Sequence, residues 1–168
     1  MRQRQTISDG RGMGGRGQLT MDSPFAAKER QRRDQMWEQL DTRVNPDDAP
    51  PRFLAELRIY RGQDRTWADQ SNTSDEFSPH GVTVSVIHTG KRYNDELRSD
   101  GLTYQSPATG RPGHDAAEIA AAKRAMELDL PVFVITPGIT PKGRQVRRGN
   151  ITRCDESARS VEIRFQSA

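Results

Sequence analysis

The sequence has few of the residues that disulfide-bonded, zinc-binding or membrane-spanning proteins need. Cys154 is its one cysteine, so an internal disulfide is excluded and a reducing compartment is expected. The three histidines, His80, His88 and His114, lack the spacing of a zinc cluster. No run of about 18 apolar residues occurs, which excludes a membrane-spanning helix, and the Arg- and Gly-rich start is not a secretory signal. We therefore expect a cytoplasmic protein with no membrane partner, no bound metal and no cofactor.

Apolar residues are also scarce, because hydrophobic residues make up 32% of the 168 and charged residues 29%. About 45–50% apolar residues, glycine included, is usual for a globular domain, so part of the chain is predicted to be disordered. Residues 1–20 fit this expectation as a flexible Arg/Gly-rich tail. Four arginines against one aspartate give this tail a charge of +3, equal to the formal charge of the whole chain. The basic residues are 22 arginines and four lysines, a bias that suits nucleic-acid phosphates but also arises from GC-rich coding.

A helix is predicted over residues 23–41, with Ser23 as its N-cap and Pro24 in the first helical position. Its polar middle, residues 28–35, is expected to be a solvated face. A Pro-rich linker follows, and residues 61–79 are polar and are expected to form a long loop. The predicted division is a tail over 1–20, an N-terminal helix over 21–44 and a domain over 52–168.

The second half of the chain has the more regular patterning. A helix is predicted over residues 115–128, where Asp115 and Glu118 stand at the spacing of a capping box. Apolar runs rich in β-branched residues predict strands. This pattern indicates one α+β domain with a mostly antiparallel, barrel-like sheet. The predicted strands cover 82–87, 102–105, 131–136, 149–153 and 160–165.

Residues 88–115 hold the densest group of binding side chains, between a predicted strand and a predicted helix. Tyr93 and Tyr104 offer flat stacking faces, and Asp95 and Asp100 can accept hydrogen bonds from an exocyclic amine. Aromatic rings, a carboxylate and cations together are the chemistry that holds an extruded nucleobase. A hairpin loop with solvated charges is the alternative. The cations that could contact phosphates here are Lys91, Arg92, Arg98 and Arg111.

The order of the motifs in this stretch resembles the SRA domain family (SET and RING-associated, or YDG), which belongs to the PUA-like superfamily. The similar segments read VSVIHTGKRYNDELRSDGLTYQSPATGRPGHD and AAEIAAAKRAMELDLPVFVI, within residues 80–136. A later segment, RQVRRGNITRCDESARSVEIRF, resembles the tail of SRA-like segments in bacterial modification-dependent restriction proteins. The resemblance implies a curved, mostly antiparallel β-barrel with flanking helices. It also implies that modified double-stranded DNA is the partner, bound by flipping a modified cytosine into a pocket.

The resemblance also implies roles for single residues. Tyr93 would stack on the flipped base, Asp95 would read its amino edge, and Tyr104 would close the other side of the pocket. Where the family has Gly-Gly before the tyrosine, this chain has Lys91 and Arg92. Tyr104 is followed by Gln105 and Ser106, where the family has Thr and Gly, so backbone contacts to the base would also differ. The identity of the base therefore stays open, and a bulkier one such as hydroxymethylated or glucosylated cytosine is an alternative. The residues implied at the pocket mouth are Gly90, Lys91, Ser106 and Thr109.

A second basic cluster lies in residues 142–153, which contain no acidic residue. It is interpreted as a stripe that follows DNA phosphates, with a solvated hairpin as the alternative. Its members are Lys142, Arg144, Arg147, Arg148 and Arg153.

The leading hypothesis is a DNA-binding module for a modified base, active in restriction of, or defence against, modified DNA. No catalytic residue is assigned, because the sequence contains no Walker-type phosphate loop, HExxH motif or nucleophile elbow. Nuclease activity is then expected from a separate domain or partner. Three alternatives stay open: a PUA-like RNA-binding module, an interaction domain, and a small metal-dependent nuclease using Asp95, Asp100 and Asp115. The sequence does not indicate an oligomeric state.

Overall fold

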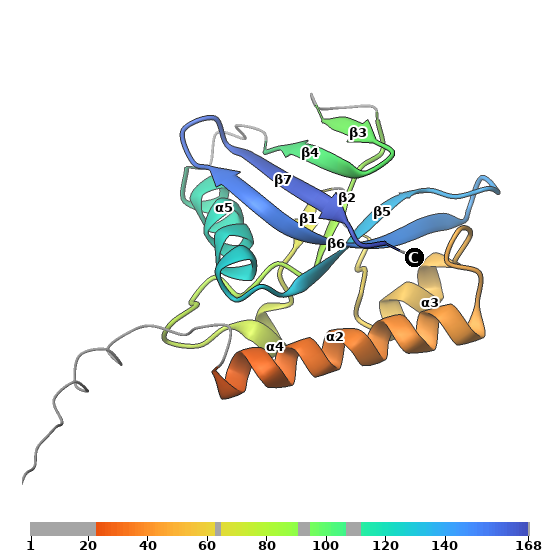
Figure 1. Cartoon of the computed structure of the whole chain (residues 1–168), viewed down its shortest axis with the longest axis horizontal. Helices are drawn as coiled ribbons and strands as arrows, with labels where there is room; N and C mark the ends of the chain where they lie inside the picture. Colours follow the sequence, from red (N-terminus) through yellow and green to blue (C-terminus); the bar gives the residue numbers. More distant parts are fainter. Residues whose placement is uncertain (1–22, 63–64, 91–94, 107–111, 168) are drawn as a thin grey trace, which may run out of the picture.

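A computed structural model describes residues 23–62, 65–90, 95–106 and 112–167 (Figure 1). The predicted tail over residues 1–20 lies outside the described residues. The described helices are α2 (Pro24–Arg43), α3 (Pro51–Glu56), α4 (Gln70–Thr73) and α5 (Pro112–Glu127). None of them combines the length and the apolar composition that crossing a bilayer requires. The strands are β1 (Thr66–Trp67), β2 (Ser85–Ile87), β3 (Glu96–Arg98), β4 (Gly101–Gln105), β5 (Pro131–Pro137), β6 (Arg144–Asp155) and β7 (Ser160–Phe165).

The seven strands form one sheet in the order β1-β2-β5-β6-β7-β4-β3. β2 and β5 pair in parallel, and the other neighbouring strands pair antiparallel. The α+β class and the mostly antiparallel sheet are therefore confirmed. Within the described part of the chain the edge strands β1 and β3 do not pair, so this sheet is open, whereas the expectation was barrel-like.

The sheet separates two hydrophobic cores, and β5 contributes to both. Val132 and Val134 of this strand pack in the core that includes α5, whereas Phe133 and Ile135 pack in the core that includes α2 and α3. Successive side chains of a strand point to opposite faces, so a strand covered on both faces needs an unbroken apolar run. The sequence PVFVI supplies that run, and Figure 1 shows α2 and α5 lying against different parts of the sheet.

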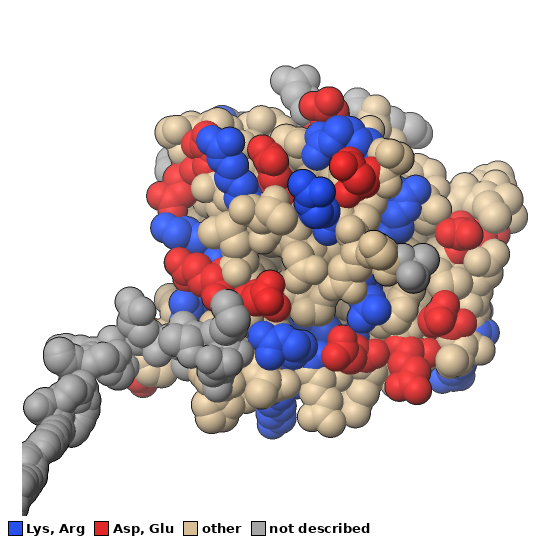
Figure 2. All heavy atoms as spheres, viewed as in Figure 1, with Lys and Arg blue, Asp and Glu red and all other residues tan. Residues whose placement is uncertain are grey.

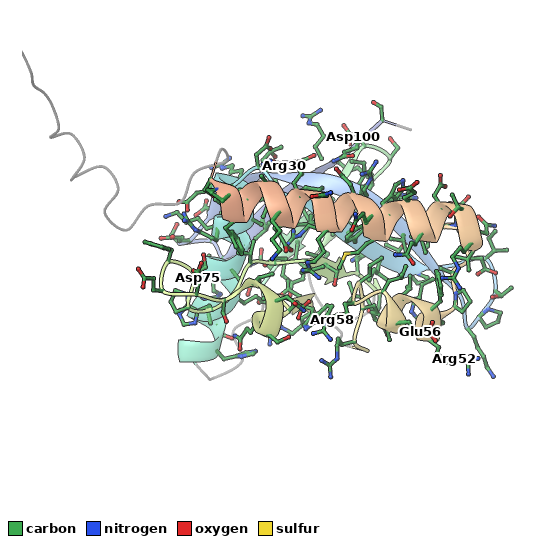
Figure 3. All side chains as sticks on the ribbon, turned by 90° about the horizontal axis from the view of Figure 1, so that it is seen from below. Arg30, Arg52, Glu56, Arg58, Asp75 and Asp100 are labelled. Atoms are coloured by element: carbon green, nitrogen blue, oxygen red, sulfur yellow. The ribbon has the colours of Figure 1, made fainter. Side chains whose placement is uncertain are left out.

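Helix α2 begins as predicted, but its polar middle is not a solvated face. The Ser23 hydroxyl accepts a hydrogen bond from the Ala26 backbone N–H at 3.1 Å, which confirms the N-cap. Glu29 and Arg33, by contrast, are buried, and Arg33 is fully so. The Arg33 Nε donates to Glu29 at 2.7 Å. Its Nη1 donates to the carbonyl oxygens of Thr83 and Pro131, at 2.8 Å each. These partners compensate for the cost of burying the charge and attach α2 to the sheet. The helix runs below the sheet in Figure 1 and in front of it in Figure 3, which is seen from below.

Other local expectations also need correction. Residues 61–79 are not a plain loop, because they contain β1 and α4. Helix α5 begins at Pro112, so Asp115 lies in its first turn and is not its N-cap. The predicted hairpin near the C-terminus is confirmed, but β6 begins at Arg144, five residues earlier than expected. Strand β3 was not predicted, because Glu96–Arg98 carries no apolar alternation.

Candidate functional site

Asp95 and Gly90, two of the predicted pocket residues, lie where β2 ends. The Asp95 side chain is 4% exposed, and its Oδ1 accepts a hydrogen bond from the Gln105 backbone N–H at 2.8 Å. Its Oδ2 lies 3.0 Å from Nδ1 of His88, the residue after β2. Gly90 has a φ of +77°, a left-handed conformation that glycine adopts without strain. Asp95 therefore connects the end of β2 to the end of β4.

Glu118 of α5 is the centre of a second buried cluster. Its carboxylate accepts hydrogen bonds from Arg65 Nη2 at 2.7 Å, Thr66 Oγ1 at 2.7 Å and the Tyr104 hydroxyl at 3.1 Å, and one from the Ser106 hydroxyl. Burial alone would raise the pKa of Glu118. The hydrogen bonds from Arg65, Ser106 and Thr66 outweigh burial and hold that pKa below its ordinary value. Glu118 is therefore a buried anion, not the capping residue that its spacing predicts.

Two residues implied for the base pocket, Tyr104 and Ser106, are held by this cluster. Both are fully buried, and the Tyr104 ring packs in the core shared with α5. Burial and the nearby Glu118 charge raise the pKa of Tyr104, so its hydroxyl stays a donor. Neither side chain reaches solvent in this structure, so a base could contact them only after a local rearrangement. Their contact with a base stays a prediction. Tyr93, Lys91, Thr109, Arg92 and Arg111 lie outside the described residues.

Replacing Glu118 tests the buried anion through the pH dependence of stability. Because the folded state lowers the pKa of this carboxyl, ionised Glu118 stabilises the fold above its ordinary pKa of 4.5. That contribution is lost as the pH falls through the lowered value. Glu118→Gln lacks this stabilisation. Its free energy of unfolding should therefore be lower than that of the parent near neutral pH, and the difference should shrink as the pH falls into the acid range. Urea unfolding at several pH values measures this. Glu56→Gln, at an exposed position of α3, is the control, and a difference independent of pH would contradict the assignment.

A cleft of about 570 Å³ opens beside this cluster, between β1, α4 and α5. Glu118 and Arg65 contribute to its wall, together with Trp67 of β1. The guanidinium carbons of Arg58 and Arg61 lie 5.7 and 5.9 Å from the Trp67 ring centroid. The cleft thus presents an aromatic ring, arginines and a carboxylate, and sequence reasoning placed none of them in the site.

Asp69 fixes the other wall of the cleft. Its φ of +47° is unusual for a residue with a side chain, and its carboxylate is fully buried. Arg58 donates to it through Nε at 3.1 Å and Nη2 at 2.6 Å, and Ser71 and Asn72 donate at 3.1 and 3.0 Å. Burial would raise the pKa of Asp69, but these hydrogen bonds, that of Arg58 foremost, lower it. The charge of Arg58 is therefore paired with a buried carboxylate in the cleft wall.

The second basic cluster does not form a single stripe. Arg148 lies over the Trp37 ring at 5.0 Å and pairs with Asp34 at 3.3 Å, both on α2. Arg147, the preceding residue, lies over the Phe165 ring at 4.9 Å. Adjacent residues of a strand point to opposite faces, so one phosphate path cannot follow both. The stripe interpretation is wrong for this pair, and phosphate contact by either arginine alone stays a prediction.

The other cations predicted to contact phosphates lie apart from one another. Lys142 is exposed in the turn between β5 and β6, and Arg153 is exposed on β6 near Asp155, at 3.8 Å. Arg98 donates to Thr103 Oγ1 at 2.9 Å on the β3–β4 hairpin. Arg144 is nearer the site, since it lines a cavity of about 250 Å³ together with His88. Blue and red side chains are interspersed on the face seen in Figure 2, so no patch of one sign covers that face.

The carboxylates proposed for a metal-dependent nuclease do not converge. Asp95 contacts His88, Asp100 pairs with Arg98 at 3.6 Å, and Asp115 pairs with Arg65 at 3.8 Å. In the part of the chain that the structure describes, no three His, Cys, Asp or Glu side chains are placed to hold a metal ion. The described geometry thus contradicts a metal site built from these three residues.

The sequence carried one signal for the missed Glu118. This residue stands four positions before Ala122 and seven before Ala125, on the same face of α5 as the buried alanines. A carboxylate in an apolar stripe predicts a buried charge that needs a cation. Its partner, Arg65, is 53 residues away, and nothing in the local pattern identifies it.

Comparisons with known proteins find similarity in solved structures. No protein-family model matches the chain, and no curated protein matches it. The modification-dependent restriction endonuclease TagI is 13% identical with a TM-score of 0.45, over 73% of this chain and 48% of that chain. The SUVH5 SRA domain complexed with hemi-methylated CG DNA is 18% identical with a TM-score of 0.45, over 71% of this chain and 83% of that chain. The SUVH5 SRA domain complexed with fully methylated CG DNA is 20% identical with a TM-score of 0.44, over 71% of this chain and 84% of that chain.

Two of these three structures are SRA domains. The chain spans about half of TagI, 48% of that chain.

Proposed function

We propose that the chain is a DNA-binding module that recognises a modified base, with a modified cytosine extruded from the duplex. The observation that carries this proposal is the Asp95 carboxylate, which is held between Gln105 and His88 at the ends of β4 and β2. An aspartate that accepts from the cytosine amino group reads that base. An ionised carboxylate has about four lone-pair positions, and these two contacts leave some of them for a base.

The surroundings of Asp95 support the same reading. The carboxylate is held in place before any ligand arrives, so ordering it costs little on binding. Arg144, which lines the cavity beside His88, is proposed to contact the phosphates that flank an extruded nucleotide. Tyr93 is proposed as the stacking partner of the base. Restriction of, or defence against, modified DNA is the proposed biology, with nuclease activity supplied by another domain or partner.

A binding titration tests this function. Matched duplexes carry cytosine, 5-methylcytosine or 5-hydroxymethylcytosine at one position, and binding is measured by fluorescence anisotropy at two salt concentrations. A preference for one modified duplex that survives the higher salt is the expected result. Equal binding of all duplexes that fades steeply with salt would mean phosphate contacts alone and would overturn the proposal. Single-stranded RNA as a competitor separates an RNA-binding module from a DNA-binding one.

Lys142 gives a separate test of the phosphate contacts. Lys142→Ala is expected to weaken all duplexes alike and to reduce the slope of log affinity against log salt by about 0.9, the value for one lost phosphate contact. Lys28→Ala is the matched control, since it removes an exposed lysine from α2, away from the β5–β6 turn. An unchanged slope in Lys142→Ala would remove this residue from the interface.

A further inference from the structure

Strand β3 is one of the two edges of the sheet. It pairs with β4 on one side, and within the described residues no strand pairs with its other side (Figure 1). An open edge presents unpaired backbone N–H and C=O groups, to which a further strand can add. β3 also carries Leu97, which is 40% exposed and is one of two large apolar side chains that the described part of the chain exposes. This edge therefore offers both backbone groups and an apolar side chain to a partner.

The β3–β4 hairpin determines which backbone groups of β3 face outward. Arg98 lies opposite Gly101, so the turn between them has two residues. The residues that flank such a turn are hydrogen-bonded to each other, and hydrogen-bonded and non-hydrogen-bonded pairs then alternate along an antiparallel ladder. The next pair, Leu97 with Leu102, is therefore of the non-hydrogen-bonded kind. The N–H and C=O of Leu97 accordingly point away from β4, toward the open edge.

The three residues of β3 are complementary to a second copy of themselves. If two β3 strands pair antiparallel about Leu97, each Glu96 lies opposite Arg98 of the other copy, and Leu97 lies opposite its own equivalent. The Glu96 and Arg98 side chains are 71% and 38% exposed. Both point to one face of the strand, and Leu97 points to the other. A twofold axis through Leu97 therefore creates two ion pairs and one apolar contact.

Other ways of pairing the two edges lose this complementarity. Parallel pairing in register would bring Glu96 next to Glu96 of the other copy, and like charges on neighbouring strands are destabilising. A shift by one residue would place Leu97 opposite a charged side chain and would turn its backbone groups out of register. The antiparallel arrangement is also compatible with the contacts inside the chain. Arg98 lies 3.8 Å from Glu96 and 3.6 Å from Asp100, which leaves donors of its guanidinium for a second copy.

We propose that the chain forms a homodimer by antiparallel pairing of two β3 strands, with Leu97 on the twofold axis. Because β3 has three residues, the contact is small and the dimer belongs to the weak, transient class of assemblies. The inference does not depend on the proposed function, and its test uses no DNA.

Sedimentation equilibrium of the full chain, at concentrations from about 10 to 500 μM, suits an interface of this weak class. The average mass is expected to rise with concentration from 18.9 kDa toward twice that value. Leu97→Lys sets two like charges against each other on the axis and should raise the dissociation constant at least about tenfold. Ile139→Lys is the matched control, since Ile139 is the other exposed large apolar residue and lies in the β5–β6 turn. It should leave the dissociation constant unchanged.

A charge exchange tests the register of the two strands. Glu96→Arg and Arg98→Glu each place like charges opposite one another and should each raise the dissociation constant roughly 5- to 30-fold, because symmetry counts every pair twice. The double variant Glu96→Arg/Arg98→Glu restores opposite charges across the axis and should recover most of the parent affinity. Thermal unfolding followed by circular dichroism verifies that the variants are folded. Hydrogen exchange gives a second measurement, since the Leu97 amide should exchange more slowly as the parent concentration rises.

The outcomes decide the proposal in either direction. A chain that stays monomeric at the highest concentration would overturn it, as would equal effects of the Leu97 and Ile139 variants. Dimers that the double charge exchange fails to restore would contradict the pairing of Glu96 with Arg98. Rescue by the double variant, together with slower exchange of the Leu97 amide, is the result that the antiparallel β3 pair predicts.

Discussion

Arg33→Met is expected to lower the free energy of unfolding by about 3–5 kcal/mol, the usual cost of removing one partner from a buried ion pair. The guanidinium is fully buried and donates to Glu29 and to the carbonyl oxygens of Thr83 and Pro131. Methionine fills a similar volume but donates nothing, so the carboxylate loses one of its partners, and the carbonyl oxygens of Thr83, Pro131 and Val82 lose the guanidinium as a donor. Urea unfolding followed by circular dichroism measures the change.

Two further variants make this stability result interpretable. Arg52→Ala removes an exposed arginine from α3 and should change stability by less than about 0.5 kcal/mol. The double variant Glu29→Leu/Arg33→Met also removes the carboxylate to which Arg32 donates at 2.8 and 2.7 Å, so it should be at least as destabilised as Arg33→Met alone. A loss below about 1 kcal/mol in Arg33→Met would show that this network does not hold α2 to the sheet.

Asp95→Asn is expected to remove most of the preference for modified DNA. A well-placed contact to a base edge contributes about 1–3 kcal/mol of discrimination, so the affinity for the preferred duplex should fall roughly 5- to 150-fold. The amide oxygen can still accept from the Gln105 N–H, and His88 can change its tautomer to accept from the amide nitrogen. The local fold should therefore persist while the charge and one acceptor are lost. Anisotropy titrations of paired modified and unmodified duplexes measure the change.

Asp100→Asn is the matched control for Asp95→Asn. Asp100 lies in the β3–β4 turn with its side chain 69% exposed, so its loss should leave the base preference unchanged. Binding of unmodified DNA, which depends on phosphates, should be the same in both variants and the parent. If Asp95→Asn keeps the full preference, Asp95 does not read the base.

Local patterns in the sequence were enough to predict much of the secondary structure. Ser23 before Pro24 predicts the start of α2, since the cap needs only a hydroxyl three residues from its donor. The apolar run at 131–136 predicts β5, and the alternation of Val161, Ile163 and Phe165 predicts β7. These elements could be predicted because neighbouring residues alone specify them.

The tertiary structure decided which charges are buried and which cations lie together. Ala26, Glu29, Arg33, Met36 and Leu40 occupy one face of α2 at spacings of three and four, but a sequence does not show that two charges in that stripe find partners. The carbonyl partners of Arg33 are 50 and 98 residues away from it in the sequence. Arg65 and Glu118, which also form a pair, are 53 residues apart. Likewise, Arg147 and Arg148 are adjacent in sequence but point to opposite faces of β6. Composition and periodicity were enough to predict an α+β chain and to single out a cation-rich segment at residues 88–115. The position of each charge was set only when distant strands and helices packed together, because burying a charge requires a partner that local sequence does not specify.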